Sequence, residues 1–326
     1  MSECRLPESR IAGARARVQA RRLPGVRARP LLNPERSVTD PEVHTPFDAL
    51  RSSIGRTETR RDVFTQAPLA GLSATLDRVD DPEPQFGTPL PPLAHWLYFL
   101  PQVPQREIGA DGHPKRGGFL PPVALPRRMW AGGRLTFERD LRIGDEAERR
   151  STIVEVETKE GRSGALVFVT VRHEIIDAQG VALIEEHDIV YRDNPQMGAV
   201  PPVPAMAAID EDFKREIVPD PVLLFRYSAL TFNGHRIHYD RRYVTEVEGY
   251  PGLIVHGPLI ATLLVDLLRR ELPDARIRAF AFKAASPLFD THPFMLCGKR
   301  GADGHIELWA RNHQGHLAMQ ARAEFA

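Results

Sequence analysis

The stretch Gly252-Leu-Ile-Val-His-Gly-Pro-Leu259 leads directly into a nearly unbroken apolar run from Leu259 to Leu268. Pro258 suits the first turn of a helix, because the N–H that proline lacks would have no partner there. A helix this apolar on all sides has to be buried, and a strongly curved antiparallel sheet wrapped around it would bury it. The sequence therefore predicts a core helix that opens at Pro258.

A dense polar segment, Thr231-Phe-Asn-Gly-His-Arg-Ile-His-Tyr-Asp240, stands shortly before this helix. It gathers polar or titratable side chains at Asn233, His235, Arg236, His238 and Asp240. The first turn of a helix adds free backbone N–H groups and the positive end of the helix dipole. Titratable groups beside such donors are what catalysis needs, so we expect an active site here.

Length and composition restrict the class of protein. The 326 residues suffice for one large domain or two of ordinary size. Lys and Arg together number 43, as do Asp and Glu, and this balance argues against nucleic acid as a partner. Cys4 and Cys297 stand far apart without metal-ligand spacing, so neither a disulfide framework nor a metal site is predicted. No apolar run approaches the ~20 residues of a membrane span, and we expect a cytoplasmic protein without a membrane partner.

Residues 1–42 differ from the rest of the chain. They are rich in Arg and Pro and lack sustained apolar periodicity, which predicts a disordered extension. An Arg-rich, acid-poor start is also typical of an organellar transit peptide. The abrupt beginning of the globular pattern at Thr45 favours a third interpretation, an over-long start with true synthesis beginning near Val43.

The remaining chain is predicted to contain two similar halves in tandem, at 43–195 and 221–326, joined by a linker at 196–220. Leu90–Leu100 is predicted to be a Pro-opened helix that corresponds to the one at Pro258, and Thr57–Phe64 a short helix. The long Gly/Pro loop from Pro101 to Pro122 is of a length that is more often functional than idle. Predicted strands cover Met129–Phe137, Ser151–Glu157, Ala165–Ile176, Val181–Tyr191, Arg276–Ala285, Met295–Lys299, His305–Asn312 and Leu317–Phe325.

The polar segment and the helix start together resemble the MaoC-like hydratase/dehydratase family of hotdog-fold enzymes. The resemblance covers about residues 45–326, including Trp130-Ala-Gly-Gly-Arg-Leu-Thr-Phe137. It implies an α+β architecture of two tandem hotdog folds (double-hotdog), with only the C-terminal one carrying the catalytic motif. It also implies that His238 is the catalytic histidine and that the N–H of Gly257 holds the thioester oxygen. Asn233 stands where the family has an aspartate, and His235-Arg236 replaces Asn-Pro.

These departures resemble the double-hotdog branch that includes mesaconyl-C4-CoA hydratases, itaconyl-CoA hydratases and mitochondrial hydroxyacyl-thioester dehydratases. The expected function is a cofactor-free hydro-lyase that adds water to a short enoyl-CoA, with mesaconyl-C4-CoA converted to citramalyl-CoA as the favoured reaction. Itaconyl-CoA or a 3-hydroxyacyl thioester is the alternative substrate. Because hotdog folds also host other chemistry, an acyl-CoA thioesterase and a non-catalytic acyl-binding protein stay open. A homodimer is a possible assembly.

The residues themselves leave several roles open. His238 suits proton transfer near neutral pH, or it pairs with Asp240 on a strand edge. Asn233 cannot act as a base; it either holds the attacking water, donates to a substrate oxygen, or forms an Asx-turn. Arg236 either pairs with Asp240 or meets a carboxylate of the substrate. The further candidates for substrate binding are His235, His256 and Trp130, with Arg127, Arg128 and Lys283 for the phosphates of coenzyme A.

Overall fold

The computed structural model describes residues 47–161, 164–194 and 203–326, and residues 43–326 form one compact unit. The predicted disorder of residues 1–42 lies outside the described residues. Within the described ranges, none of the helices combines the length and the apolar character that crossing a bilayer requires.

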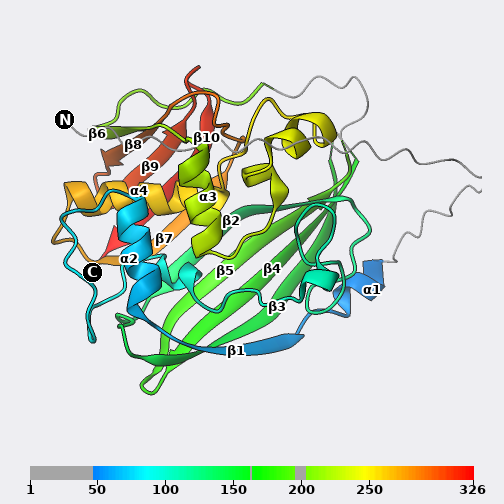
Figure 1. Ribbon diagram of the computed structural model, residues 1–326, viewed down its shortest axis with the longest axis horizontal. Helices are drawn as coiled ribbons and strands as arrows, with labels where there is room; N and C mark the ends of the chain where they lie inside the picture. Colours follow the sequence, from blue (N-terminus) through cyan, green and yellow to red (C-terminus); the bar gives the residue numbers. More distant parts are fainter. Residues whose placement is uncertain (1–46, 162–163, 195–202) are drawn as a thin grey trace, which may run out of the picture. The chain divides into compact units, whose positions relative to one another are not determined.

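A single ten-stranded antiparallel sheet forms the framework (Figure 1). Its strand order is β1-β3-β4-β5-β2-β7-β10-β9-β8-β6. The last five strands repeat the pattern of the first five in reverse, so that β6 to β10 correspond in sequence order to β1 to β5. The two halves meet where β2 pairs with β7. This repeat agrees with the predicted tandem hotdog architecture. The strands are β1 (Thr57–Val63), β2 (Arg127–Phe137), β3 (Glu146–Gly161), β4 (Gly164–Asp177), β5 (Gly180–Arg192), β6 (Phe213–Ile217), β7 (Ile277–Ala284), β8 (Phe294–Arg300), β9 (Ile306–Arg311) and β10 (Leu317–Phe325).

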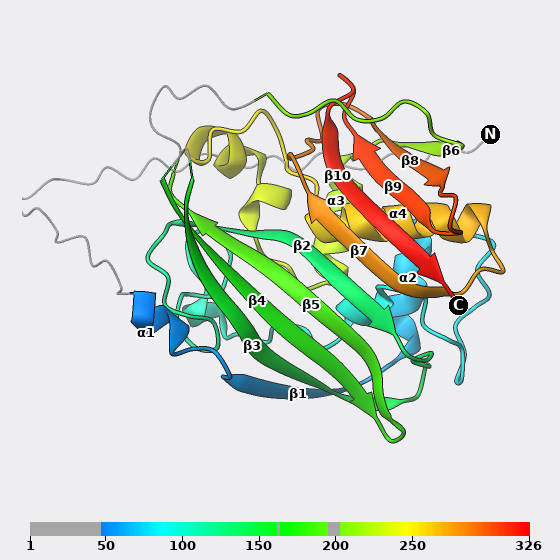
Figure 2. The ribbon, with the colours of Figure 1, turned by 180° about the vertical axis from the view of Figure 1, so that it is seen from behind.

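The longer helices lie on one face of this sheet, and Figure 2 shows the opposite face with the strands in front. Helix α4 (Gly257–Glu271) confirms the predicted core helix, since every residue from Leu259 to Leu268 is buried. It packs on β6, β8, β9 and β10, while α2 (Gln66–Thr75) packs beside α3 (Pro221–Leu230). The remaining helical elements are α1 (Phe47–Arg51), the short 3₁₀-helices η1 (Ala94–Leu97), η2 (Gln105–Glu107) and η3 (Arg236–His238), and the π-helical turn η4 (Tyr243–Val247).

The predicted helix at Leu90–Leu100 is wrong. The segment contains only the 3₁₀-turn η1, and non-glycine residues with positive φ stand on both sides of that turn, Leu93 at 71° and Phe99 at 53°. Left-handed backbone cannot continue a right-handed helix. Burial of Leu93, Ala94 and Leu97 gave the segment its helix-like pattern. Among the described residues of the N-terminal half there is therefore no counterpart of α4.

The predicted helix at Thr57–Phe64 is also wrong, because Thr57–Val63 is the edge strand β1, paired with β3. Its half-buried positions are Glu58, Arg60 and Asp62, so the strand lacks the apolar alternation that identifies most strands. The region interpreted as a linker also contains structure. Its last part includes β6, which pairs with β8 at the other edge of the sheet, whereas 203–212 carries no helix or strand.

Candidate active site

A cavity of about 780 Å³ lies between the inner face of the N-terminal strands and the polar segment 231–240. This volume is in the range of small-molecule sites, ~300–1,000 Å³. Its wall includes residues of both halves of the chain, among them Asn233, Arg236 and Pro258 from the second half and Trp96, Trp130, Arg149, His173, Glu185 and His187 from the first.

His238 ends η3 and is 7% exposed. Its Nδ1 lies 2.7 Å from the carbonyl oxygen of Ile254. Because a carbonyl only accepts, Nδ1 carries the hydrogen, and Nε2 keeps its lone pair without a partner among the described residues. Burial, which outweighs the opposing bond to Ile254, lowers the pKa of His238 to about 3. At neutral pH the ring is therefore an uncharged base with a free Nε2.

His256 lies against the imidazole ring of His238. The two imidazoles stack with centroids 3.7 Å apart and planes 17° apart. His256 is fully buried, and its Nε2 lies 2.8 Å from Oγ of Ser228 on α3. Because none of its surface is exposed, His256 orients His238 and does not reach the cavity, so the expectation that it binds substrate is wrong.

Gly257 is the first residue of α4, and its N–H has no acceptor within the helix. A Cβ at this position would meet no atom within 4 Å, so open space adjoins the backbone here. The side chain of His256 does not cap the helix start. The geometry therefore leaves a backbone donor available to an oxygen at the positive end of the helix dipole.

Asn233 lines the cavity and forms the Asx-turn that was one of its predicted roles. Its Oδ1 accepts the backbone N–H of His235 at 3.0 Å, and its own backbone N–H donates to Ser228 at 2.8 Å. Since Oδ1 is engaged, Nδ2 is the group left to face a water or a substrate oxygen.

Arg236 is largely committed to the protein. It is the first residue of the 3₁₀-turn η3. Its Nε and Nη2 donate to one oxygen of Asp240 at 3.0 and 2.7 Å, and Nη1 donates to the carbonyl of Ala110 at 3.0 Å. The guanidinium also lies 4.2 Å from the ring centroid of Tyr243. Asp240 therefore pairs with Arg236 and not with His238, which removes the strand-edge interpretation of that histidine.

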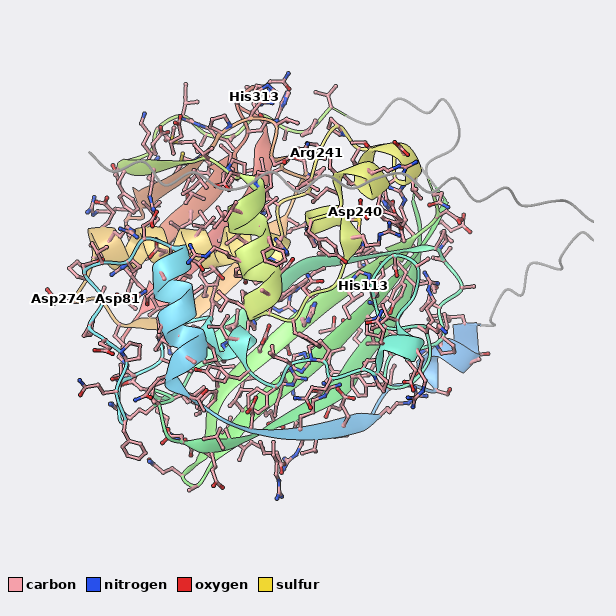
Figure 3. The ribbon with its side chains drawn as sticks, viewed as in Figure 1. Asp81, His113, Asp240, Arg241, Asp274 and His313 are labelled. Atoms are coloured by element: carbon pink, nitrogen blue, oxygen red, sulfur yellow. The ribbon has the colours of Figure 1, made fainter. Side chains whose placement is uncertain are left out.

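His235 faces the long loop that follows η2, and Figure 3 labels His113 of that loop and Asp240 of the polar segment. The rings of His113 and His235 lie 3.9 Å apart, and the N–H of Arg236 donates to the carbonyl of Asp111 at 2.9 Å. Asp111, His113 and His235 bring one ligand atom each within 4.8 Å of one another, a spacing that can hold a metal ion. Sequence reasoning missed this cluster because its members are far apart along the chain.

Trp130 lies on the other side of the cavity, within a buried polar floor that sequence reasoning also missed. Its ring centroid lies 3.9 Å from that of His187, with the two planes tilted by 34°. Glu185 accepts from His95 at 3.0 Å and from Trp96 at 3.1 Å, and His173 bonds Ser151 at 2.8 Å. The available signal was the inward-facing positions of β4 and β5, where polar residues interrupt an apolar alternation.

The buried histidines predict a pH-dependent stability. Burial lowers the pKa of His173 and His238 to about 3 and of His187 to about 4, below the ~6.5 of an unfolded chain. Between these values the unfolded state binds more protons, so the free energy of unfolding decreases as pH falls below ~6.5, by about 1.4 kcal/mol per unit for each group. Urea titrations at pH 7.5 and 5.5 measure this loss. His173→Gln should make it smaller by about one group's share.

Comparison with known proteins gives consistent relatives. Residues 93–290 match the family described as hydroxyacyl-thioester dehydratase type 2. The chain is 47% identical over 274 residues to a mesaconyl-C(4)-CoA hydratase of Chloroflexus aurantiacus, covering 83% of this chain and 96% of that protein. Its fold is similar to a MaoC-like dehydratase of Phytophthora capsici (TM-score 0.61, 15% identity, 86% and 98% of the two chains). It is also similar to a Mycobacterium tuberculosis protein described as a double hotdog (TM-score 0.51, 14% identity, 86% and 97%).

Proposed function

Because the chain belongs to the hydroxyacyl-thioester dehydratase type 2 family, we propose that it is a hydro-lyase that hydrates mesaconyl-C4-CoA to citramalyl-CoA. The observation that carries the proposal is the pairing of His238, a neutral base with a free Nε2, with the open N–H of Gly257 at the start of α4. The identity to the Chloroflexus hydratase supports the substrate.

The chemistry needs a base, an acid and an oxyanion donor. His238 takes a proton from water through Nε2 while the water oxygen bonds to the β-carbon. Negative charge moves onto the thioester oxygen, where the N–H of Gly257 stabilises it; one such donor typically contributes ~10²–10³ in rate. His238 then returns the proton to the α-carbon, so that one water is added and the histidine is restored.

Asn233 has a positioning role in this scheme. An amide does not titrate, so the residue that replaces the family's aspartate cannot share the proton transfer. Its Nδ2 is free to donate to the oxygen of the attacking water or to a substrate oxygen, while its Oδ1 holds the turn. His238 therefore acts as the single acid and base of the site.

The dehydration of a 3-hydroxyacyl thioester is the same reaction in reverse, and the family description favours it as the second candidate. The same atoms serve both directions, so the acyl chain alone distinguishes the two. A panel of enoyl-CoAs that includes mesaconyl-C4-CoA, itaconyl-CoA and crotonyl-CoA, followed by mass spectrometry, should give a product heavier by one water. Release of free CoA thiol without that product would identify a thioesterase and overturn the proposal.

Independence from a cofactor stays a prediction, and metal removal tests it. The proposed chemistry uses protons and backbone donors alone, so prolonged treatment with EDTA followed by gel filtration should leave turnover unchanged. A loss of activity that added zinc or magnesium restores would contradict this. Asp111, His113 and His235 would then be the candidate metal ligands. In that case His113→Ala should abolish the recovery of activity on adding the metal.

Two further features belong to the same proposal. A homodimer is proposed as the assembly, and light scattering coupled to gel filtration measures it. A cytoplasmic location is proposed from the composition and from the absence of a spanning helix among the described residues, and cell fractionation tests it.

A further inference from the structure

The cavity wall contains a cation without a partner. Arg149 lies on β3 and lines the same cavity as Asn233 and Pro258. Its Nε is buried without a hydrogen bond, and no acceptor or carboxylate among the described residues bonds the rest of its guanidinium. The ring centroid of Phe99 lies 5.5 Å from its Cζ. A guanidinium has five N–H donors and stays charged. Arg149 therefore has donors and a positive charge available for an anion.

The neighbours of Arg149 do not meet this need. Directly opposite on β1 stands Arg60, and like charges in register across two strands destabilise a sheet. The Nη1 of Arg60 donates to the carbonyl of Leu100 at 3.1 Å, while its Nε approaches Glu58 only to 3.8 Å. Glu185 is the nearby anion, but its carboxylate is bound by His95 and Trp96. Arg149 of the cavity wall and its neighbour Arg60 are therefore incompletely neutralised.

The other titratable groups of the wall differ from Arg149. Arg236 is already paired with Asp240 and with a backbone carbonyl. His173 and His187 are kept uncharged by burial, which lowers their pKa to about 3 and about 4. Within the described residues that line the cavity, Arg149 is thus the cation that lacks a bonded acceptor. A buried charge without a partner is costly, and such a charge is expected where a ligand supplies the partner.

We propose that Arg149 is the binding site for a free carboxylate on the acyl group, so that the cavity selects dicarboxylic monothioesters over simple enoyl thioesters. This inference rests on the proposed hydration of an acyl-CoA and identifies the residue that binds the carboxylate of mesaconyl-C4-CoA. A planar guanidinium matches a carboxylate with two parallel hydrogen bonds. The assignment gives Arg149 the carboxylate-binding role that the sequence left open for Arg236.

A binding experiment with two saturated thioesters tests the site without depending on catalysis. Succinyl-CoA and butyryl-CoA both carry four-carbon acyl groups and cannot be hydrated, but only succinyl-CoA has the carboxylate. By calorimetry, the protein should bind succinyl-CoA more tightly, and Arg149→Met should weaken that binding about 10²-fold while changing butyryl-CoA by less than about 3-fold. Arg149→Lys should restore part of the affinity for succinyl-CoA.

Arg150→Met is the matched control. Arg150 follows Arg149 on β3, is exposed, and therefore points to the opposite face of the sheet. This variant should bind both thioesters as the unaltered protein does. Equal loss of both ligands in Arg149→Met, or no preference for succinyl-CoA in the unaltered protein, would overturn the assignment. So would a carboxylate-selective loss in Arg236→Met that Arg149→Met does not show.

The proposed function fails separately from this inference. If the unaltered protein leaves mesaconyl-C4-CoA and crotonyl-CoA unchanged, hydration is excluded, yet the comparison of succinyl-CoA with butyryl-CoA still decides the role of Arg149. If hydration occurs, the ratio of kcat/KM for mesaconyl-C4-CoA to that for crotonyl-CoA should fall about 10²-fold in Arg149→Met. An unchanged ratio would contradict the proposal.

Discussion

Replacing His238 should lower the turnover of the enoyl-CoA substrate by ~10²–10⁴ while the protein stays folded, because the proposed proton transfer uses its Nε2, whereas Nδ1 is held by the carbonyl of Ile254. Asparagine is the sharper substitution. Its Nδ2 stands near the position of the histidine Nδ1 and can keep the hydrogen bond to Ile254, whereas nothing replaces Nε2. His238→Ala removes both groups and so measures the two together.

Steady-state kinetics with thermal unfolding of each variant separates the two effects. His238→Asn should match the unaltered protein in melting temperature and bind butyryl-CoA normally, with the loss confined to kcat. His238→Asn with more than a tenth of the original turnover would exclude the histidine as the acid and base. Ser228→Ala serves as a second comparison. This substitution removes the hydrogen-bond partner of His256, the ring that lies behind His238. It should lower kcat far less than the loss of the His238 Nε2 does.

The strands and the core helix could be predicted because burial leaves a periodic mark on sequence. β4 and β5 are rich in β-branched residues, and α4 has ten consecutive buried positions of which eight are apolar. The two wrong helix predictions have different physical causes. On β1 the inward side chains are charged, so no apolar alternation identifies the strand. At Leu90–Leu100, buried leucines mimic a helix although the backbone at Leu93 and Phe99 is left-handed.

The candidate site likewise has some features that the sequence could predict and others that it could not. His238, Asn233 and Gly257 could be proposed from one local motif, because they lie close together along the chain. The tautomer of His238 could not, since it depends on the carbonyl of Ile254 across the fold. The sequence left two roles open for Arg236, and the 3₁₀-turn η3 directs its side chain to Asp240. Arg149 could not be singled out among many arginines, because its lack of a partner is a property of three-dimensional packing.

Asp266, at the centre of the buried face of α4, is expected to be the most sensitive position for stability outside the apolar core. It is 1% exposed and accepts hydrogen bonds from Arg78 at 3.1 Å, Arg215 at 2.6 Å and Arg270 at 2.8 Å. Arg215 lies on β6 and Arg78 follows α2, so this carboxylate joins elements of both halves. Arg78 is itself almost fully buried, although Asp80 and Asp81 also contact it.

Asp266→Ala should therefore lower the free energy of unfolding by about 3–5 kcal/mol, the range for removing one partner of a buried ion pair. For a unit of this size that corresponds to a melting temperature lower by about 10 °C. The better helix propensity of alanine offsets only a few tenths of a kcal/mol. Asp274→Ala, at an exposed aspartate just beyond the same helix (Figure 3), is the matched control and should change the melting temperature by less than about 2 °C. Adding Arg78→Met to Asp266→Ala should recover part of the loss, because the uncompensated guanidinium is then removed. If Asp266→Ala melts where Asp274→Ala does, the buried cluster contributes nothing to folding and α4 is held by its apolar contacts alone.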